Sequence, residues 1–367
     1  MHYDVIDADS HINNPPDAWR TLPARFRDRA PRMVDMGGYD GWTVEGRPAT
    51  PLIPLSFAAG KKPEELGQRQ IRFADQPRGC SDPVARLRDL EADGIDAQVL
   101  YGDGTGSAQD PELRTALVHA YNDFLSEFVR AAPARFIGLG IVTMDDPAAA
   151  VREVERARTL GLRGLFIGLD GADFPISAAR YDRFWAAAAA ERLPVSIHIG
   201  GGAGMKRSLA HDTEVAPGTL EAFLTLAPMT VAHTLGMLIF GGVFARHPDL
   251  RVVIAEGGIG WLAYYLERVD SVFEKQRYWA RSQLSEHPST YFRRQVFATF
   301  EEDLAGMRTY DLIGADRIMW ASDFPHSDTT YPHSREAIAR HFGALPPADR
   351  RAMVCGNAAR LYGLEAA

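Results

Sequence analysis

The chain contains very little cysteine. Its 367 residues include only Cys80 and Cys355, which lie far apart in the sequence and in no CxxC arrangement. Two such thiols make neither a disulfide framework nor a zinc knuckle, so we expect a protein of a reducing compartment. The chain also lacks a basic segment followed by an apolar stretch at its start, which predicts a cytoplasmic location.

Excess positive charge and long apolar runs are missing as well. The 40 Lys and Arg residues face 48 Asp and Glu residues, for a formal net charge of -8. This charge opposes binding to a phosphate backbone. No uninterrupted apolar run approaches the roughly 18 residues of a transmembrane helix. The sequence therefore predicts a small-molecule substrate and neither nucleic acid nor a membrane as a partner.

The composition that is present is that of a globular α/β protein. Hydrophobic residues make up 46% and charged residues 24% of the chain, which is ordinary for a folded domain. The length fits one α/β barrel with insertions, so we predict a single domain over residues 1–367. Residues 13–80 are rich in Pro, Gly, Arg and aromatic residues and show little periodicity, which predicts an irregular insertion that acts as a lid or binding loop.

From Asp82 onward, apolar runs alternate regularly with helical patterns. Such alternation indicates parallel strands joined by helices. The predicted strands are Val5–Asp9, Ile95–Tyr101, Phe136–Val142, Gly164–Gly168, Pro194–His198, Leu250–Ala255, Val296–Thr299 and Ile318–Asp323. Eight strands are the number that closes a barrel, so the predicted fold class is an α/β (β/α)8 TIM barrel.

Polar side chains stand at the carboxyl ends of four predicted strands. Asp9 and His11 are two residues apart at the end of the first strand, so they share one face. The others are His198, Glu256 and Asp323. Reactive residues of such barrels lie at this end. Two carboxylates and two imidazoles make a set of four ligands for one metal ion. They come from Asp9, His11, His198 and Asp323. Positions left open on the ion would take water or substrate.

An ordered set of short motifs then extends over residues 7–362. They are Asp7-Ala8-Asp9-Ser10-His11, Asp82-Pro83 with Arg86-Leu87, Asp93-Gly94-Ile95-Asp96, Phe244 with His247-Pro248-Asp249-Leu250, Glu256-Gly257-Gly258 with Trp261, Ser322-Asp323-Phe324-Pro325-His326, and Asn357-Ala358 with Leu361-Tyr362. With this set the chain resembles the second amidohydrolase family of the amidohydrolase superfamily, which includes non-oxidative decarboxylases such as aminocarboxymuconate-semialdehyde decarboxylase. The resemblance implies a distorted (β/α)8 barrel, the four metal ligands named above, and a homodimer or related hetero-oligomer.

The functional prediction depends on two residues at which this chain differs from the family pattern. Family decarboxylases usually carry His or Glu where this chain has Asp9, and a His near the sixth strand where this chain has Glu256. A carboxylate beside a metal site is protonated, contacts the ion, or binds a second cation. His233, Glu256 and His326 would form the N,N,O set of a second ion. For His233 and His326, hydrogen bonding that orients another ligand stays open.

We therefore predict first a dinuclear non-haem iron enzyme (Fe/Fe or Fe/Mn), similar to the oxygen-activating branch of the superfamily. It would be a monooxygenase that uses dioxygen to hydroxylate a small organic acid or natural-product intermediate. The first alternative is a mononuclear Zn or Mn enzyme, a non-oxidative decarboxylase or hydrolase in which Glu256 acts as general base or acid. The second alternative is a non-catalytic subunit that supports an active partner.

Overall fold

The computed structural model describes the chain except residues 1, 68–70, 103–107, 169–174, 200–217 and 365–367. Eight parallel strands follow one another in a single sheet, in the order β1-β5-β6-β7-β8-β9-β10-β11. Their bounds are β1 Ile6–Ile12, β5 Ala97–Gly102, β6 Phe136–Thr143, β7 Gly164–Gly168, β8 Val195–His198, β9 Val252–Ala255, β10 Val296–Phe300 and β11 Ile318–Trp320. The predicted number and order of strands are confirmed.

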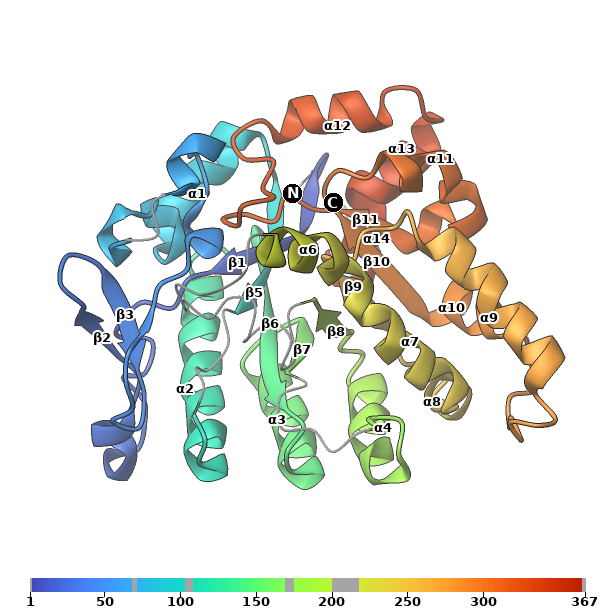
Figure 1. Cartoon of the computed structure of the whole chain (residues 1–367), viewed down its shortest axis with the longest axis horizontal. Helices are drawn as coiled ribbons and strands as arrows, with labels where there is room; N and C mark the ends of the chain where they lie inside the picture. Colours follow the sequence, from blue (N-terminus) through green and yellow to red (C-terminus); the bar gives the residue numbers. More distant parts are fainter. Residues whose placement is uncertain (1, 68–70, 103–107, 169–174, 200–217, 365–367) are drawn as a thin grey trace.

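The sheet closes on itself between β1 and the segment after β11. Ser10 pairs with Phe324 in a parallel bridge, and the Asp323 N–H donates to the Asp9 carbonyl at 3.0 Å. The closed sheet and the helices between its strands form a (β/α)8 barrel, which confirms the predicted fold class. Figure 1 shows helices α2, α3 and α4 side by side along the outside of the strands.

Helices connect the strands and cover the barrel. They are α1 Pro83–Asp93, α2 Pro111–Arg130, α3 Pro147–Thr159, α4 Asp182–Ala190, α6 Thr219–Leu226, α7 Val231–Phe240, α8 Val243–Arg246, α9 Leu262–Gln276, α10 Pro288–Gln295, α11 Leu304–Ile313, α12 Ser334–Phe342, α13 Pro347–Arg351 and α14 Asn357–Leu361.

An Asp-Pro pair starts three of these helices. The Asp side chain accepts a backbone N–H of the first turn, and Pro occupies a position whose N–H has no partner in the helix. The pairs are Asp82-Pro83 before α1, Asp110-Pro111 before α2 and Asp146-Pro147 before α3. These local signals determine where the three helices begin.

One predicted strand ends earlier than expected, for a reason that concerns the site. The sequence predicts a strand as far as Asp323, but β11 ends at Trp320. Asp323 has φ 54° and Glu256, directly after β9, has φ 51°. Both residues therefore adopt the left-handed conformation, which cannot continue a strand.

The segment predicted as an irregular insertion, residues 13–80, contains a small antiparallel sheet that the sequence analysis missed. Its strands are β2 Arg32–Asp35, β3 Asp40–Thr43 and β4 Thr50–Pro51. Strands this short carry too few residues to show an alternation of apolar and polar positions. The N–H groups of Ala58 and Ala59 both donate to the Pro325 carbonyl at 3.0 Å, so the segment packs beside the carboxyl end of β11. A lid function stays a prediction.

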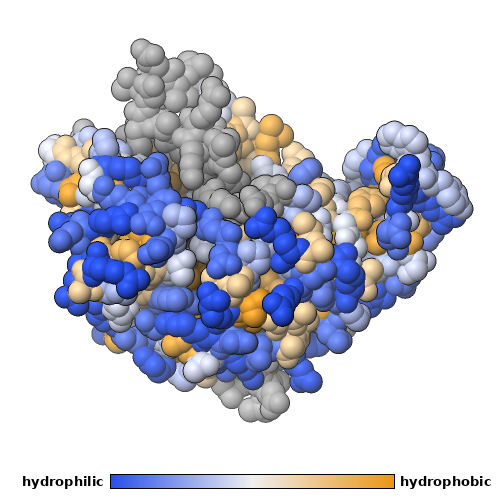
Figure 2. Space-filling model, turned by 90° about the horizontal axis from the view of Figure 1, so that it is seen from below, coloured by the Kyte–Doolittle hydropathy of each residue, from blue (hydrophilic) through white to orange (hydrophobic). Residues whose placement is uncertain are grey.

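One stretch of the described chain, Thr219–Phe240, passes the length and composition test for a membrane span. Its mean hydropathy is 1.6 and 33% of it is buried. It is not one continuous α-helix, because α6 and α7 are separated by the 3-10 turn Ala227–Thr230, which contains Pro228. Core helices of soluble proteins share this length and composition. Seen from below, hydrophilic residues cover most of the surface and hydrophobic residues form separate patches (Figure 2).

Candidate metal centre

The carboxyl ends of four strands bring six of the seven predicted ligands together. Asp9 and His11 lie in β1, His198 ends β8, Glu256 follows β9, and Asp323 and His326 follow β11. Their donor atoms form two overlapping groups, Asp9–His11–His198 and His11–Glu256–Asp323–His326, within each of which every donor lies within 4.8 Å of the others. His11 belongs to both groups and therefore lies at the centre of the cluster.

The first group is compact. Asp9 Oδ1 lies 3.5 Å from His11 Nε2 and 3.6 Å from His198 Nε2. The two imidazole nitrogens are 3.2 Å apart. All three side chains are at least nine-tenths buried. Three donors thus face one another in a pocket with little access to water.

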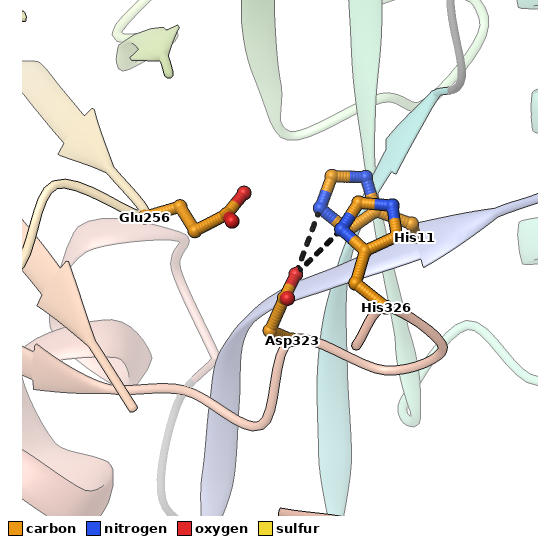
Figure 3. A group of neighbouring side chains, drawn as sticks. All are labelled: His11, Glu256, Asp323 and His326. Atoms are coloured by element: carbon orange, nitrogen blue, oxygen red, sulfur yellow. Dashed lines mark ion pairs between the residues drawn. The ribbon is translucent and has the colours of Figure 1, made fainter. Parts of the chain in front are cut away.

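The second group surrounds Asp323. Its Oδ1 lies 3.3 Å from His11 Nε2 and 2.9 Å from His326 Nδ1, and the two imidazole rings stack with centroids 3.9 Å apart. Figure 3 shows Glu256 reaching toward Asp323 from the side opposite the two histidines. Glu256 Oε2 lies 3.1 Å from His198 Nε2, which connects the two groups.

These distances fit one divalent cation. Ligand atoms bound at about 2.1 Å lie about 3.0 Å apart when they occupy adjacent positions, close to the separations observed here. Asp9 Oδ1 and Asp323 Oδ2 are buried and accept no hydrogen bond, an arrangement that is costly for carboxylates unless a cation binds them. A mixed set of imidazole and carboxylate donors suits ions such as Zn²⁺ or Mn²⁺.

Burial and like charge act on the carboxylates of the cluster. Burial raises the pKa of Glu256 well above its ordinary value, and the negative charges of Asp323 and Glu301 raise it further. Burial also raises the pKa of Asp323, although the nearby His326 opposes the rise. Burial, together with the neighbouring His326 and His198, lowers the pKa of His11 well below its ordinary value. The imidazole of His11 is therefore neutral, the form that binds a metal.

The left-handed backbone of Glu256 and Asp323 is held by hydrogen bonds. Such a conformation costs a non-glycine residue about 1–2 kcal/mol. The Glu256 N–H donates to the Thr299 hydroxyl at 2.8 Å, and the Asp323 N–H donates to the Asp9 carbonyl at 3.0 Å. Strain of this kind is concentrated at functional sites, because there a side chain has to be aimed in a particular direction.

Two functional candidates were missed by the sequence analysis. Thr299, fully buried in β10, donates its hydroxyl to Asp9 Oδ2 at 3.1 Å and thereby joins Asp9 to Glu256. Glu301 directly follows β10, and its Oε1 is buried without a hydrogen-bond partner. Burial, then the charges of Asp323 and Asp9, raises the pKa of Glu301 well above its ordinary value. Its position after the seventh predicted strand was the signal that could have found it.

Buried polar groups support the cluster from below. Asp7 accepts hydrogen bonds from the N–H and hydroxyl of Ser322 and from the Gln98 amide. Arg86 is fully buried and donates to Gln98 Oε1 at 2.9 Å, to the Gly79 carbonyl at 3.1 Å and to the His11 carbonyl. These bonds hold β1 and its ligands in place.

His233 does not join the cluster. It is exposed on α7 and belongs to neither group of donors found among the described residues. The sequence placed it in a segment leading to the sixth strand, but the side chain at this turn of the helix faces solvent. The N,N,O set predicted for a second ion from His233, Glu256 and His326 is therefore not assembled.

Comparisons with known proteins agree on the family. The family model described as Amidohydrolase matches residues 6–364. A gamma-resorcylate decarboxylase of Rhodococcus jostii is 28% identical over 342 residues, which cover 87% of this chain and 96% of that protein. A 2-amino-3-carboxymuconate-6-semialdehyde decarboxylase of Dictyostelium discoideum is 25% identical over 312 residues, 80% of this chain and 78% of that protein.

Solved structures agree on the fold. An amidohydrolase from Mycobacterium avium subsp. paratuberculosis superposes with a TM-score of 0.81 at 24% identity, over 99% of this chain and 100% of that chain. A manganese-bound 5-carboxyvanillate decarboxylase from Novosphingobium aromaticivorans has a TM-score of 0.69 at 20% identity, over 98% of this chain and 97% of that chain. At these identities the likeness concerns the barrel alone.

The predicted dinuclear iron oxygenase is wrong. These relatives are decarboxylases, and they favour the alternative reading of the sequence, a non-oxidative decarboxylase. Glu256 was interpreted as a ligand of a second metal ion together with His233. In the structure Glu256 belongs to the group around Asp323 and lies 3.1 Å from His198, whereas His233 lies outside both donor groups found among the described residues. The preference for iron and for two ions has no support in either comparison.

Proposed function

Since the chain belongs to the amidohydrolase family, we propose that it is a metal-dependent, non-oxidative decarboxylase of a small aromatic or unsaturated carboxylic acid. The observation that carries the proposal is the convergence of buried imidazole and carboxylate donors at the mouth of the barrel, with Glu256 against His198. Relatives that cover most of the chain act as decarboxylases, which supports this reaction over hydrolysis.

In this proposal Asp9, His11, His198 and Asp323 hold one divalent ion, with Mn²⁺ and Zn²⁺ as the candidates. Such an ion supplies positive charge that attracts a substrate carboxylate and its neighbouring oxygen. Without it the carboxylates of Asp9 and Asp323 would repel an anionic substrate, because they lie close together in a buried site. A metal ion held by these donors would therefore allow a carboxylic acid substrate to bind.

Glu256 supplies the proton. Decarboxylation breaks the bond between the carboxyl carbon and the adjacent carbon, leaves the electron pair on that adjacent carbon and releases CO2. A proton must then form the new C–H bond. Burial and the neighbouring carboxylates raise the pKa of Glu256, which favours the protonated form that a general acid requires. His326, 2.9 Å from Asp323 Oδ1, keeps that carboxylate in place.

Anaerobic turnover tests the proposal. The protein, loaded with Mn²⁺ or Zn²⁺, is given gamma-resorcylate or 5-carboxyvanillate without dioxygen, and CO2 release is measured. We expect CO2 and the decarboxylated product in equal amounts. Glu256→Gln lowers kcat by about 10²-fold or more with the metal content unchanged, whereas His198→Ala loses the metal. Glu267→Gln, on the exposed face of α9, is the matched control. Turnover that requires dioxygen, or CO2 release unaffected by Glu256→Gln, contradicts the proposal.

Two further expectations stay predictions. A homodimer follows from the resemblance, and light scattering on the purified protein measures it. A cytoplasmic location follows from the thiol content, and fractionation of the host cell with an antibody to the protein measures it.

A further inference from the structure

A cavity opens at the end of the barrel opposite the metal cluster. Its volume is about 630 Å³. It is bordered by Pro194 before β8, Arg251 before β9, Arg317 before β11 and Arg294 near the end of α10. The same strands carry His198, Glu256 and Asp323 at or after their carboxyl ends. Since the strands are parallel, the cavity and the metal cluster lie at opposite rims of one barrel.

The charge of this cavity is opposite to that of the protein. Five arginines line it against a single carboxylate, in a chain with a formal net charge of -8. The charged lining residues are Arg192, Arg251, Arg294, Arg317, Arg360 and Asp249. Such a concentration of one sign in a concave surface focuses the field on an ion of the other sign.

The guanidinium groups are only partly neutralised by neighbours. Arg294 pairs with Glu286 at 3.1 Å and Arg317 with Asp316 at 2.9 Å. In the part of the chain that the structure describes, no ion pair within 4.0 Å is found for the three other arginines of the cavity, Arg192, Arg251 and Arg360. The cavity therefore keeps most of its positive charge.

The arginines are close enough to repel one another. Burial lowers the pKa of Arg251, and the positive charges of Arg317 and Arg294 lower it further. The guanidinium of Arg317 lies 5.0 Å from the centre of the Phe297 ring, and its Nε is buried with no hydrogen-bond partner. An unpaired buried donor among like charges is costly unless an acceptor binds there.

A structural explanation accounts for single arginines but not for the set. Basic residues after helices stabilise the last carbonyl groups, as expected for Arg192 after α4 and Arg294 in the last turn of α10. This effect does not require five guanidinium groups around one cavity, where each raises the free energy of the others. A cavity of this size is typical of sites for small molecules.

We propose that this cavity binds a small polyanion with two or more phosphate or carboxylate groups. Guanidinium groups bind both in bidentate geometry, and one monovalent anion would neutralise only a small part of the charge. The proposal does not depend on the decarboxylase activity, because none of the cavity residues belongs to the metal cluster.

Calorimetry on the metal-loaded full-length protein tests it with two probes. Fructose 1,6-bisphosphate offers phosphates, and propane-1,2,3-tricarboxylate offers carboxylates. We expect at least one to bind with 1:1 stoichiometry and a Kd below about 1 mM, and the stronger of the two identifies the group that the site prefers. Added NaCl is expected to weaken the binding.

The variants decide where a probe binds. Arg251→Gln and Arg317→Gln are expected to weaken binding about tenfold or more. Arg192→Gln removes a charge from an exposed side chain and serves if the more buried variants fail to fold. Arg130→Gln, exposed in α2, loses the same charge elsewhere and is expected to bind normally. Absence of binding by both probes at millimolar concentration overturns the proposal. Binding that all three cavity variants retain overturns it too, because the anion then binds elsewhere.

Discussion

Thr299 offers a sensitive test of how the metal cluster is held. Its hydroxyl accepts the Glu256 N–H at 2.8 Å and donates to Asp9 Oδ2 at 3.1 Å. Thr299→Val keeps the shape of the side chain but leaves both groups without this partner. A buried polar group left unsatisfied costs about 1–3 kcal/mol, and the Asp9 carboxylate is fully buried. We expect the variant to lose about 2–3 kcal/mol in free energy of unfolding.

The metal affinity is expected to change as well. Removing a hydrogen bond to a ligating carboxylate typically lowers affinity by about 10–100-fold. Competition with a fluorescent chelator measures this change, and urea unfolding of the metal-free protein measures the stability. Thr299→Ser is the matched control, because it keeps the hydroxyl and loses only a methyl group, at about 0.8 kcal/mol. If Thr299→Val binds the metal as tightly as Thr299→Ser, the hydroxyl does not position Asp9 and the reasoning is refuted.

Three other predictions concern Arg86, His233 and the two cysteines. Arg86→Met leaves the Gly79 and His11 carbonyls without their buried donor and is expected to destabilise the fold by about 3 kcal/mol, measured by urea unfolding; a loss under about 1 kcal/mol would contradict this. His233→Ala is expected to keep the metal content and turnover of the unmodified protein, because the side chain is exposed outside the cluster; loss of metal on elemental analysis would restore it as a ligand. Burial raises the pKa of the Cys80 thiol to about 12 and also raises that of Cys355. Both thiols therefore stay protonated at pH 8, and labelling by a thiol reagent is expected to be about 10³-fold slower than in urea; rapid labelling of the native protein would show that they are accessible.

Much of the barrel could be predicted because its signals are local. The Asp-Pro pairs that start α1, α2 and α3 and the apolar runs of the strands act over a few neighbouring residues. The sheet β2–β4 could not be predicted in this way. Its strands are too short for a periodic pattern, and they pair through backbone groups that the sequence does not display.

The candidate site shows the same division. Asp9, His11, His198, Glu256 and Asp323 could be found because each follows or ends a predicted strand, and parallel strands present these ends at one rim. Thr299 and Glu301 were missed, since a threonine within a strand is ordinary and no polar residue after the seventh strand was considered. His233 was predicted as a ligand but lies exposed outside the donor groups, because the sequence does not show which face of a helix will meet the barrel.

The sequence by itself therefore determined the strand order, the family resemblance and the donor types, all of which depend on residue identity and short-range spacing. Tertiary structure decided which donors lie within reach of one another and where charge accumulates. The left-handed turns at Glu256 and Asp323 aim two carboxylates into one cluster, and barrel closure gathers five arginines, more than 160 residues apart along the chain at the extremes, around one cavity at the other rim. Distances between side chains arise only when the barrel closes, so these features could not be derived from spacing along the chain.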